Sequence, residues 1–375
     1  MNLYRIKLDW SLIGIVALLI TIGFMMIIST SSVVGFSSYN DSFFFIKRHF
    51  MFLVIGIFAA TLGAIIPIKV YQKYLVFGLL MCALLLILTL TTGVSIGGAR
   101  RWLNMGLVQF QPVECVKFCL VVFIAHILDR KKKSLSIFSK SSLPILVIVS
   151  CFFMMIILQP DLGNIGLIAI VMMCLLFLSA VPLWHLIAIG IAGISGLTVV
   201  ILKHSYQMKR VLSFLSPWED PLGINYHMIQ SLIAIGIGGF MGVGIGESKL
   251  KYFYLPLQYS DFIFSIICEE GGFVLAAVVI ILYAALLVKG YQVSKQSDTY
   301  YGFYLGMGVT LLIVLQAFIN IAVVIGLMPV TGIPLTFISF GGSSLVMSMF
   351  YIGILLNIHS EHWKKQYDLT THKKQ

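Results

Sequence analysis

Three carboxylates lie in and beside one apolar stretch of this chain, YFYLPLQYSDFIFSIICEEGG at residues 252–272. They are Asp261, Glu269 and Glu270, and the whole chain of 375 residues has only 14 acidic residues. An ionisable side chain at membrane depth is costly, so each of the three is a candidate for function. Asp261 ends a long connection and is the candidate general base. Glu269 and Glu270 lie about 12 Å deeper by helix rise, where hydrogen bonds to loops or other helices are the alternative role.

A second group of ionisable residues follows a proline in the sequence QPVECVK at residues 111–117. Pro112 suits the first turn of a helix, and Glu114 and Lys117 are three residues apart on that helix, so they can pair. The pair either neutralises itself while holding neighbouring helices together, or leaves Lys117 facing a polar cavity that receives an anionic substrate.

Two arginines stand next to a tryptophan, at Arg100 and Arg101. The fork of donors on a guanidinium group suits a phosphate or diphosphate, although anchoring at the membrane interface is the alternative. Asp161 lies in the tight turn QPDLG at residues 159–163. It could cap the helix that follows or belong to a site.

Together these groups suit a substrate with an anionic head and a lipid tail. A carboxylate can act as a general base, and fixed cations can stabilise a diphosphate leaving group. The sequence has no Walker motif, Rossmann glycine fingerprint or zinc motif. Its six cysteines all fall in apolar segments, where they are expected to be small buried residues and not a disulfide framework or a metal site.

Membrane helices must position these residues. Hydrophobic residues make up 59% of the chain, charged residues 10%, and the mean hydropathy is +1.02, which exceeds what a soluble domain can bury. A span needs roughly 20 apolar residues. The sequence therefore predicts an all-α polytopic membrane protein, a single domain over 1–375, with about ten transmembrane helices. The predicted spans are 11–30, 50–68, 74–93, 110–128, 143–159, 163–181, 183–202, 262–288, 302–326 and 342–359.

The net charge of +11 is explained by topology and not by nucleic acid. With the N-terminus inside, 15 of the 25 basic residues fall on the cytoplasmic side, nine fall outside, and Lys117 lies within a span. This asymmetry follows the positive-inside rule. Both termini are therefore expected in the cytoplasm, and the one long connection, 203–261, is expected outside, with short helices and glycine turns on the outer face.

Seven segments, in order along nearly the whole chain, resemble the SEDS family (shape, elongation, division and sporulation). The resemblance implies a ten-helix peptidoglycan glycosyltransferase that polymerises lipid II outside the plasma membrane of a bacterium. It also implies a partner, a single-span class B penicillin-binding protein that crosslinks the new strands, and contacts with other divisome or elongasome membrane proteins. The YRIKLDWSLI and SKLKYFYLP segments are more similar to the division members than to the elongation members. The seven segments are GARRWL (98–103), QPVECVK (111–117), QPDLG (159–163), RVLSFLSPWEDPLG (210–223), QSLIAIGIGGFMGVGIG (230–246), YLPLQYSDFIF (254–264) and PVTGIPLTFISFGGSSL (329–345).

Asp261 matches the essential aspartate of the family pattern LPExHTDFIF. The chain departs from the family in that pattern and at three other places. Leu257, Tyr259 and Ser260 stand where the pattern has Glu, His and Thr; Gly271 replaces Leu, His49 replaces Gln and Phe340 replaces Tyr.

The resemblance also implies the reaction. Lipid II carries its sugar through an α-linked diphosphate and the product is β-1,4-linked, so one inversion is expected, with Asp261 taking the proton of the incoming 4-hydroxyl. A divalent cation such as Mg²⁺ or Mn²⁺ could assist, and no organic cofactor and no nucleic-acid partner are expected. A flippase of the same precursor and a non-catalytic activator of the penicillin-binding protein remain alternatives. The candidate diphosphate and sugar residues are Arg48, Arg100, Arg101, Glu114, Lys117, Asp161, Ser343 and Ser344.

Overall fold

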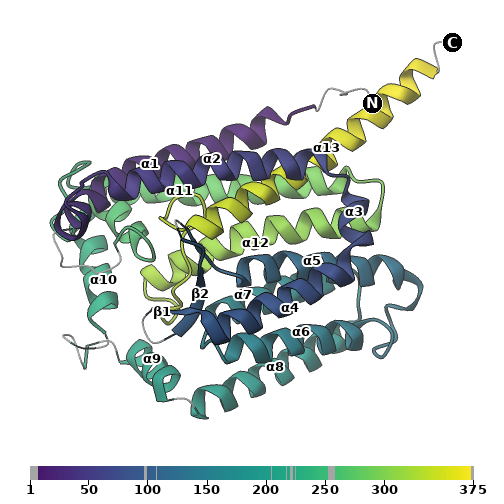
Figure 1. The fold of residues 1–375 in the computed structure, drawn as a ribbon, viewed down its shortest axis with the longest axis horizontal. Helices are drawn as coiled ribbons and strands as arrows, with labels where there is room; N and C mark the ends of the chain where they lie inside the picture. The colour runs from purple at the N-terminus through teal and green to yellow at the C-terminus, as the bar shows by residue number, and fades with distance from the viewer. Residues whose placement is uncertain are drawn as a thin grey trace.

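The apolar segments fold into helices, whose backbone hydrogen bonds are satisfied within each segment, as a lipid environment requires. The computed structural model describes residues 7–96, 99–106, 108–203, 205–216, 218–219, 223, 225–251 and 258–372 (Figure 1). Its helices are α1 (Trp10–Tyr39), α2 (Phe44–Ile65), α3 (Ile68–Lys73), α4 (Leu75–Thr92), α5 (Val113–Arg130), α6 (Ser142–Ile157), α7 (Leu162–Leu178), α8 (Leu183–Lys203), α9 (Ser205–Leu215), α10 (Tyr226–Gly238), α11 (Ile263–Lys295), α12 (Tyr300–Val324) and α13 (Gly342–His372).

Each of the ten predicted spans corresponds to one of these helices. Within the described ranges, α1, α2, α4, α8, α11, α12 and α13 are long and apolar enough to cross a membrane. The apolar helices α6 and α7 are shorter, with 16 and 17 residues. The helix α5 carries the Glu114 and Lys117 charges and ends on Asp129 and Arg130. The all-α polytopic prediction is confirmed.

Buried α12 is the centre of the bundle. It contacts α5, α7, α10, α11 and α13, while α13 runs along α2. The α2–α13 pair is close because glycine stands where the backbones meet. A Cβ atom at Gly353 would lie 2.1 Å from the carbonyl oxygen of Ala60.

A small antiparallel ribbon, which the sequence did not predict, follows α4. It consists of β1 (Val94–Ile96), β2 (Ala99–Asn104) and β3 (Gln109–Phe110), in the order β1-β2-β3. Successive side chains of a strand point to opposite faces. Arg100 is therefore exposed, whereas its neighbour Arg101 is half-buried and faces the protein.

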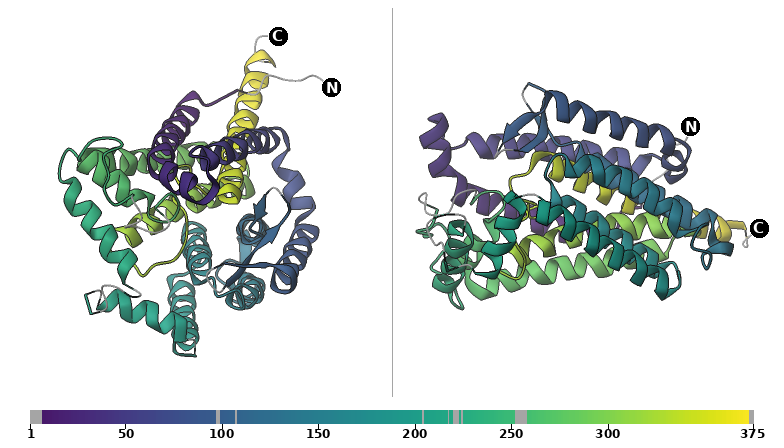
Figure 2. Two further views of the ribbon diagram at one scale, coloured as in Figure 1. Left: turned by 60° about the vertical axis from the view of Figure 1, so that its left-hand side comes forward. Right: turned by 90° about the horizontal axis from the view of Figure 1, so that it is seen from below.

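The long connection contains the predicted short helices, α9 and α10. They lie with the ribbon at one end of the bundle, whereas α1 begins and α13 ends at the other (Figures 1 and 2). The loop after α10 packs into a break in α11 at Gly272, which has φ +64° and ψ −166°. Val243 N donates to Glu269 O at 2.9 Å, and Phe273 N donates to Gly239 O at 2.9 Å. The loop thus fastens both halves of α11 on either side of the break.

Candidate active site

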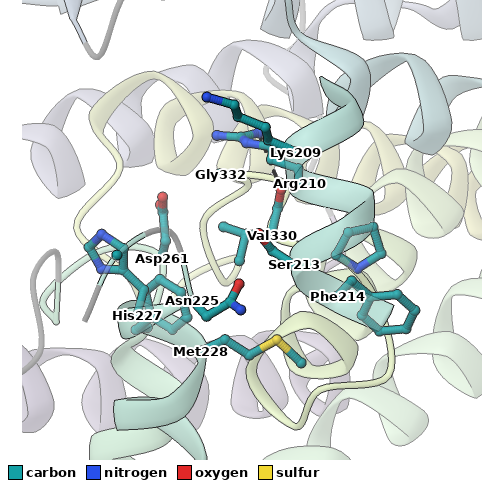
Figure 3. Close-up of a pocket in the computed structure, with 13 residues that line it drawn as sticks. Lys209, Arg210, Ser213, Phe214, Asn225, His227, Met228, Asp261, Val330 and Gly332 are labelled. Carbon is teal, nitrogen blue, oxygen red and sulfur yellow. Dashed lines mark hydrogen bonds between the residues drawn. The ribbon is translucent and has the colours of Figure 1, made fainter. Parts of the chain in front are cut away.

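A cavity of about 440 Å³ opens at this end of the bundle, and Asp261 lines it. Positive charge comes from α9: in Figure 3 the side chains of Lys209 and Arg210 reach over the cavity, and the Asp261 carboxylate points toward them. Asn225 and His227, at the start of α10, add polar groups. A carboxylate and two cations therefore share one cavity. The apolar lining includes Phe214, Met228, Phe262, Pro329 and Val330.

Asp261 lies in the turn directly before α11 and is half-buried. Burial raises the pKa of its carboxyl to about 6, because a charged group loses hydration there. Arg101, a hydrogen bond from Ser260 and Arg210 lower the pKa and partly offset this effect. A carboxylate with a pKa near neutrality is suited to accept a proton from a sugar hydroxyl.

Arg101, on β2, also lies close to Asp261. Its Nε donates to the carbonyl oxygen of Gln159 at 3.1 Å, and its guanidinium also donates to that of Pro160. Gly332, with φ +74°, lies close to both this arginine and Asp261. A Cβ atom at Gly332 would lie 3.7 Å from Asp261 Oδ2 and 3.9 Å from Arg101 Nη1. The predicted base and one of the predicted arginines are thus neighbours.

Asp161 caps α7, which was one of its two predicted roles. Its carboxylate accepts from Asn164 N at 3.4 Å and from Asn164 Nδ2 at 2.8 Å. Arg101 Nε lies 3.9 Å from Asp161 Oδ2, and only 2% of Asp161 is exposed. The carboxylate therefore also helps to hold the arginine that faces Asp261.

The predicted pair of Glu114 and Lys117 is confirmed. Lys117 Nζ donates to Glu114 Oε1 at 2.7 Å and to Gln316 Oε1 at 2.8 Å. Gln316 in turn donates to Ser344 Oγ at 2.8 Å and to Pro334 O at 3.1 Å. Lys117 is 1% exposed and does not line the cavity. A buried charge needs such a partner, so the pair has a structural role in this conformation.

None of the predicted serines and arginines, Arg101 included, is among the described residues that line the cavity. Ser343 Oγ accepts from Gln111 N at 3.1 Å, which ties the start of α13 to the start of α5. Arg48 is exposed and stacks on Phe44. Arg100 is exposed, and its Nη1 donates to the carbonyl oxygen of Leu90 at 3.4 Å. Of the predicted arginines, the structure brings only Arg101 to Asp261 within the part of the chain that it describes.

Glu269 and Glu270 adopt the alternative role and hold a loop. Glu269 accepts from Ser248 Oγ at 2.5 Å and from Lys249 N at 2.9 Å. Glu270 accepts from Ser29 Oγ at 2.5 Å, and Lys251 Nζ lies 3.4 Å away. Both carboxylates thus fasten residues 248–251 to α11 and α1 and do not line the cavity.

Three of the departures from the family pattern contact one another. The rings of Tyr259 and Phe340 lie 4.4 and 5.2 Å from that of Phe45, and the His49 ring lies 6.4 Å from that of Phe340. With Phe45 they form an aromatic cluster that includes Tyr259 of the Asp261 turn, so each replacement packs against another. Leu257 lies outside the described residues.

Lys209, Arg210, Asn225 and His227 were not among the site residues predicted from the sequence. Arg210 does begin the quoted segment RVLSFLSPWEDPLG, and both cations count among the basic residues of the outer face. Asn225 and His227 carry no such signal. What places them is the fold of α9 and α10 over the 329–332 segment, where Arg210 Nη1 donates to Val330 O at 3.2 Å.

The donor set of the cavity does not fit a resident metal ion. Among the residues that the structure describes, Asp261 is the one carboxylate that lines it. No group of three or more His, Cys, Asp or Glu side chains that could hold a metal occurs among the described residues. No step of the mechanism is therefore assigned to a bound metal.

The chain matches known families and proteins over nearly its full length. The model of the FtsW/RodA/SpoVE family, described as cell cycle protein, matches residues 9–364. Stage V sporulation protein E of Bacillus subtilis (strain 168) is 38% identical over 352 residues, 93% of this chain and 96% of that protein. The probable peptidoglycan glycosyltransferase FtsW of Geobacter sulfurreducens (strain DL-1 / KN400) is 37% identical over 341 residues, 90% of this chain and 91% of that protein.

Solved structures share the fold. One is a chain from work described as structural coordination of polymerization and crosslinking by a peptidoglycan synthase complex. Its TM-score is 0.78 at 27% identity, over 95% of this chain and 98% of that chain. The crystal structure of the rod shape determining protein RodA from Thermus thermophilus has a TM-score of 0.71 at 24% identity, over 95% and 97% of the two chains. The second likeness concerns the fold alone.

Proposed function

The chain belongs to the FtsW/RodA/SpoVE family and is a peptidoglycan glycosyltransferase of a bacterial membrane; we propose that it polymerises lipid II at the outer face, with Asp261 as the general base. One observation carries the assignment of the base. Asp261 is the carboxylate of a cavity that also holds Lys209 and Arg210, and burial raises its pKa to about 6.

The reaction follows from these groups. Asp261 takes the proton from the 4-hydroxyl of the incoming sugar. The hydroxyl oxygen then forms a bond to the anomeric carbon of the other sugar, and the bond from that carbon to the diphosphate breaks on the opposite side. The α-linkage becomes a β-1,4 linkage, and undecaprenyl diphosphate leaves with the electron pair.

The leaving diphosphate needs positive charge at fixed positions. We assign this role to Lys209 and Arg210, which line the cavity, and to Arg101, which flanks Gly332 beside Asp261. The exposed Arg48 and Arg100 are better suited to the membrane surface. Lys117 remains a candidate only for a conformation in which its pair with Glu114 opens.

A single experiment tests the enzyme against its alternatives. Purified wild-type protein and the Asp261→Asn variant, each with its partner, receive labelled lipid II in detergent. The variant is nearly isosteric but cannot accept the proton, so we expect polymer to fall about 10²–10⁴-fold with expression unchanged. Undiminished polymer from Asp261→Asn would move the base elsewhere. Lipid II movement across liposomes without polymer would indicate a flippase, and neither activity would indicate a non-catalytic activator.

We also propose a partner and a topology. The likeness to a chain of a peptidoglycan synthase complex supports a single-span class B penicillin-binding protein as the partner, together with other division proteins of the membrane. The relatives named for division and sporulation support a role at a septum. Both termini are proposed to be cytoplasmic, because α1 begins and α13 ends at the end of the bundle opposite α9 and α10 (Figure 1), whose residues line the Asp261 cavity.

A further inference from the structure

Three consecutive carbonyl groups, those of residues 259–261, each accept a hydrogen bond from a different residue. Phe340 N donates to the first at 2.9 Å, and Ser339 Oγ donates to the second at 2.6 Å. The third carbonyl, that of Asp261, accepts from Asn320 Nδ2 at 2.7 Å. The backbone that carries the candidate base is therefore held at three consecutive residues of its turn.

Asn320 differs from the other two donors because it holds two segments at once. The same Nδ2 also donates to the carbonyl oxygen of Ile333 at 2.8 Å. Residues 329–333 include Pro329, Val330 and Gly332, which line one wall of the cavity. One amide thus uses both hydrogens to join the Asp261 turn to the segment that forms this wall.

We propose that Asn320 is a positioning residue that sets where the Asp261 carboxylate stands relative to the 329–333 wall. It is 2% exposed and does not line the cavity, so it acts through the two backbone segments and never touches substrate. This inference rests on the proposed function, in which Asp261 is the base.

The amide residues of α12 indicate that Asn320 does more than pack in the core. An unpaired amide in an apolar helix is unfavourable, yet α12 carries two amides one turn apart, at Gln316 and Asn320. They bind adjacent carbonyls of the same segment, those of Pro334 and Ile333. Asn320 Oδ1 is buried without a hydrogen-bond partner in the described part of the chain. The side chain is therefore oriented to give both hydrogens to the cavity walls, at the expense of its own oxygen.

The chain contains a matched control at the far end of the bundle. Asn357 on α13 is 5% exposed, and its Nδ2 donates to Ala64 O at 2.6 Å and Ile66 O at 3.2 Å. Its Oδ1 likewise lacks a partner among the atoms described. The chemistry equals that of Asn320, but neither carbonyl belongs to the cavity.

The test compares Asn320→Leu with Asn357→Leu, since leucine has a similar volume and no donor. Both variants are purified with the partner, and thermal stability, kcat, KM and the pH dependence of lipid II polymerisation are measured. We expect both to lose stability, whereas Asn320→Leu alone should lose about 10- to 100-fold in kcat with little change in KM, because a displacement near 1 Å has such an effect. The acidic limb of its pH–rate profile, where the rate falls as the pH is lowered, should also move to lower pH. The reason is that a released Asp261 carboxylate gains hydration, which lowers its pKa.

Equal kcat losses in the two leucine variants, or wild-type kcat and pH dependence in Asn320→Leu, would overturn the inference. If Asn320→Leu does not accumulate, Asn320→Ser, which keeps one donor on a shorter side chain, should show a smaller loss in the same direction; wild-type kinetics there would also overturn it. Failure of the proposed function looks different. In that case Asp261→Asn itself would polymerise normally.

Discussion

Acidification should stop polymerisation through one group, the Asp261 carboxyl. Burial raises its pKa to about 6, although Arg101, Ser260 and Arg210 lower it. A general base works only in its ionised form. The rate should therefore be full above the pKa and should be lost as the pH falls through it.

The size of the effect follows from the titration. At pH 7 a carboxyl with a pKa of about 6 is ionised in about ten molecules of eleven, and at pH 5 in about one of eleven, so the rate falls about tenfold. A carboxyl at the ordinary value of 3.8 would stay more than about 90% ionised at pH 5 and would give almost no change. The rate ratio between pH 7 and pH 5 therefore distinguishes a raised pKa of Asp261 from an ordinary one.

The assay measures the rate of lipid II polymerisation by the purified protein with its partner at saturating substrate. The pH is varied from about 4.5 to about 8 in steps of about half a unit. A sample held at pH 5 and returned to pH 7 shows whether the loss is reversible. Arg210→Gln removes a cation that lowers the pKa of Asp261. Its acidic limb should therefore move to higher pH.

His227 is the necessary control, because it lines the same cavity and burial lowers its pKa from 6.5. An imidazole could therefore produce a similar limb. His227→Gln should keep the limb where it is in the wild type. A limb that disappears in His227→Gln, or a flat profile from pH 7 to pH 5 in the wild type, would refute the assignment to Asp261.

Three further outcomes are expected. Lys117→Ala should insert into the membrane yet polymerise poorly, because Glu114 is left as an unpaired buried charge; normal polymer would make the lysine dispensable. Glu269→Gln should lose less activity than Asp261→Asn in the same lipid II assay, since it holds a loop outside the cavity, and an equal loss would contradict this. A divalent cation that arrives with the diphosphate of the substrate would make polymerisation sensitive to a chelator such as EDTA, with recovery on adding Mg²⁺ or Mn²⁺; an unchanged rate would show that the side chains alone stabilise the leaving group.

Local sequence spacing was enough to predict several contacts. Glu114 and Lys117 pair because residues three apart meet on one helix face. Asp161 caps α7 because it directly precedes an apolar helix. The ten helices that match the predicted spans follow from the apolar runs, and among the described residues seven of them are long and apolar enough to cross a membrane. In each case the partner lies within a few residues or the signal is hydropathy, so no knowledge of the tertiary fold is needed.

The cavity could not be assembled in this way, because its members come from distant segments. Arg100 and Arg101 are adjacent in sequence, but the ribbon turns them to opposite faces, and only one meets Asp261. Lys209 and Arg210 join the site because α9 folds onto the 329–332 segment. A six-residue strand such as β2 and a loop contact are too short to leave a clear periodic signal in the sequence.

The same buried polar groups allow the irregular backbone and fix the base. A chain within a membrane can leave the helix only where its peptide groups are satisfied by protein or face a cavity. At the Asp261 turn and the 333–334 segment, that requirement is met by Asn320, Gln316 and Ser339. Removing any of them affects stability and geometry together, so loss of activity alone is uninformative. Only a comparison with an equivalent amide elsewhere, such as Asn357, separates the two, and it would show that the amides of α12 decide where the carboxylate stands.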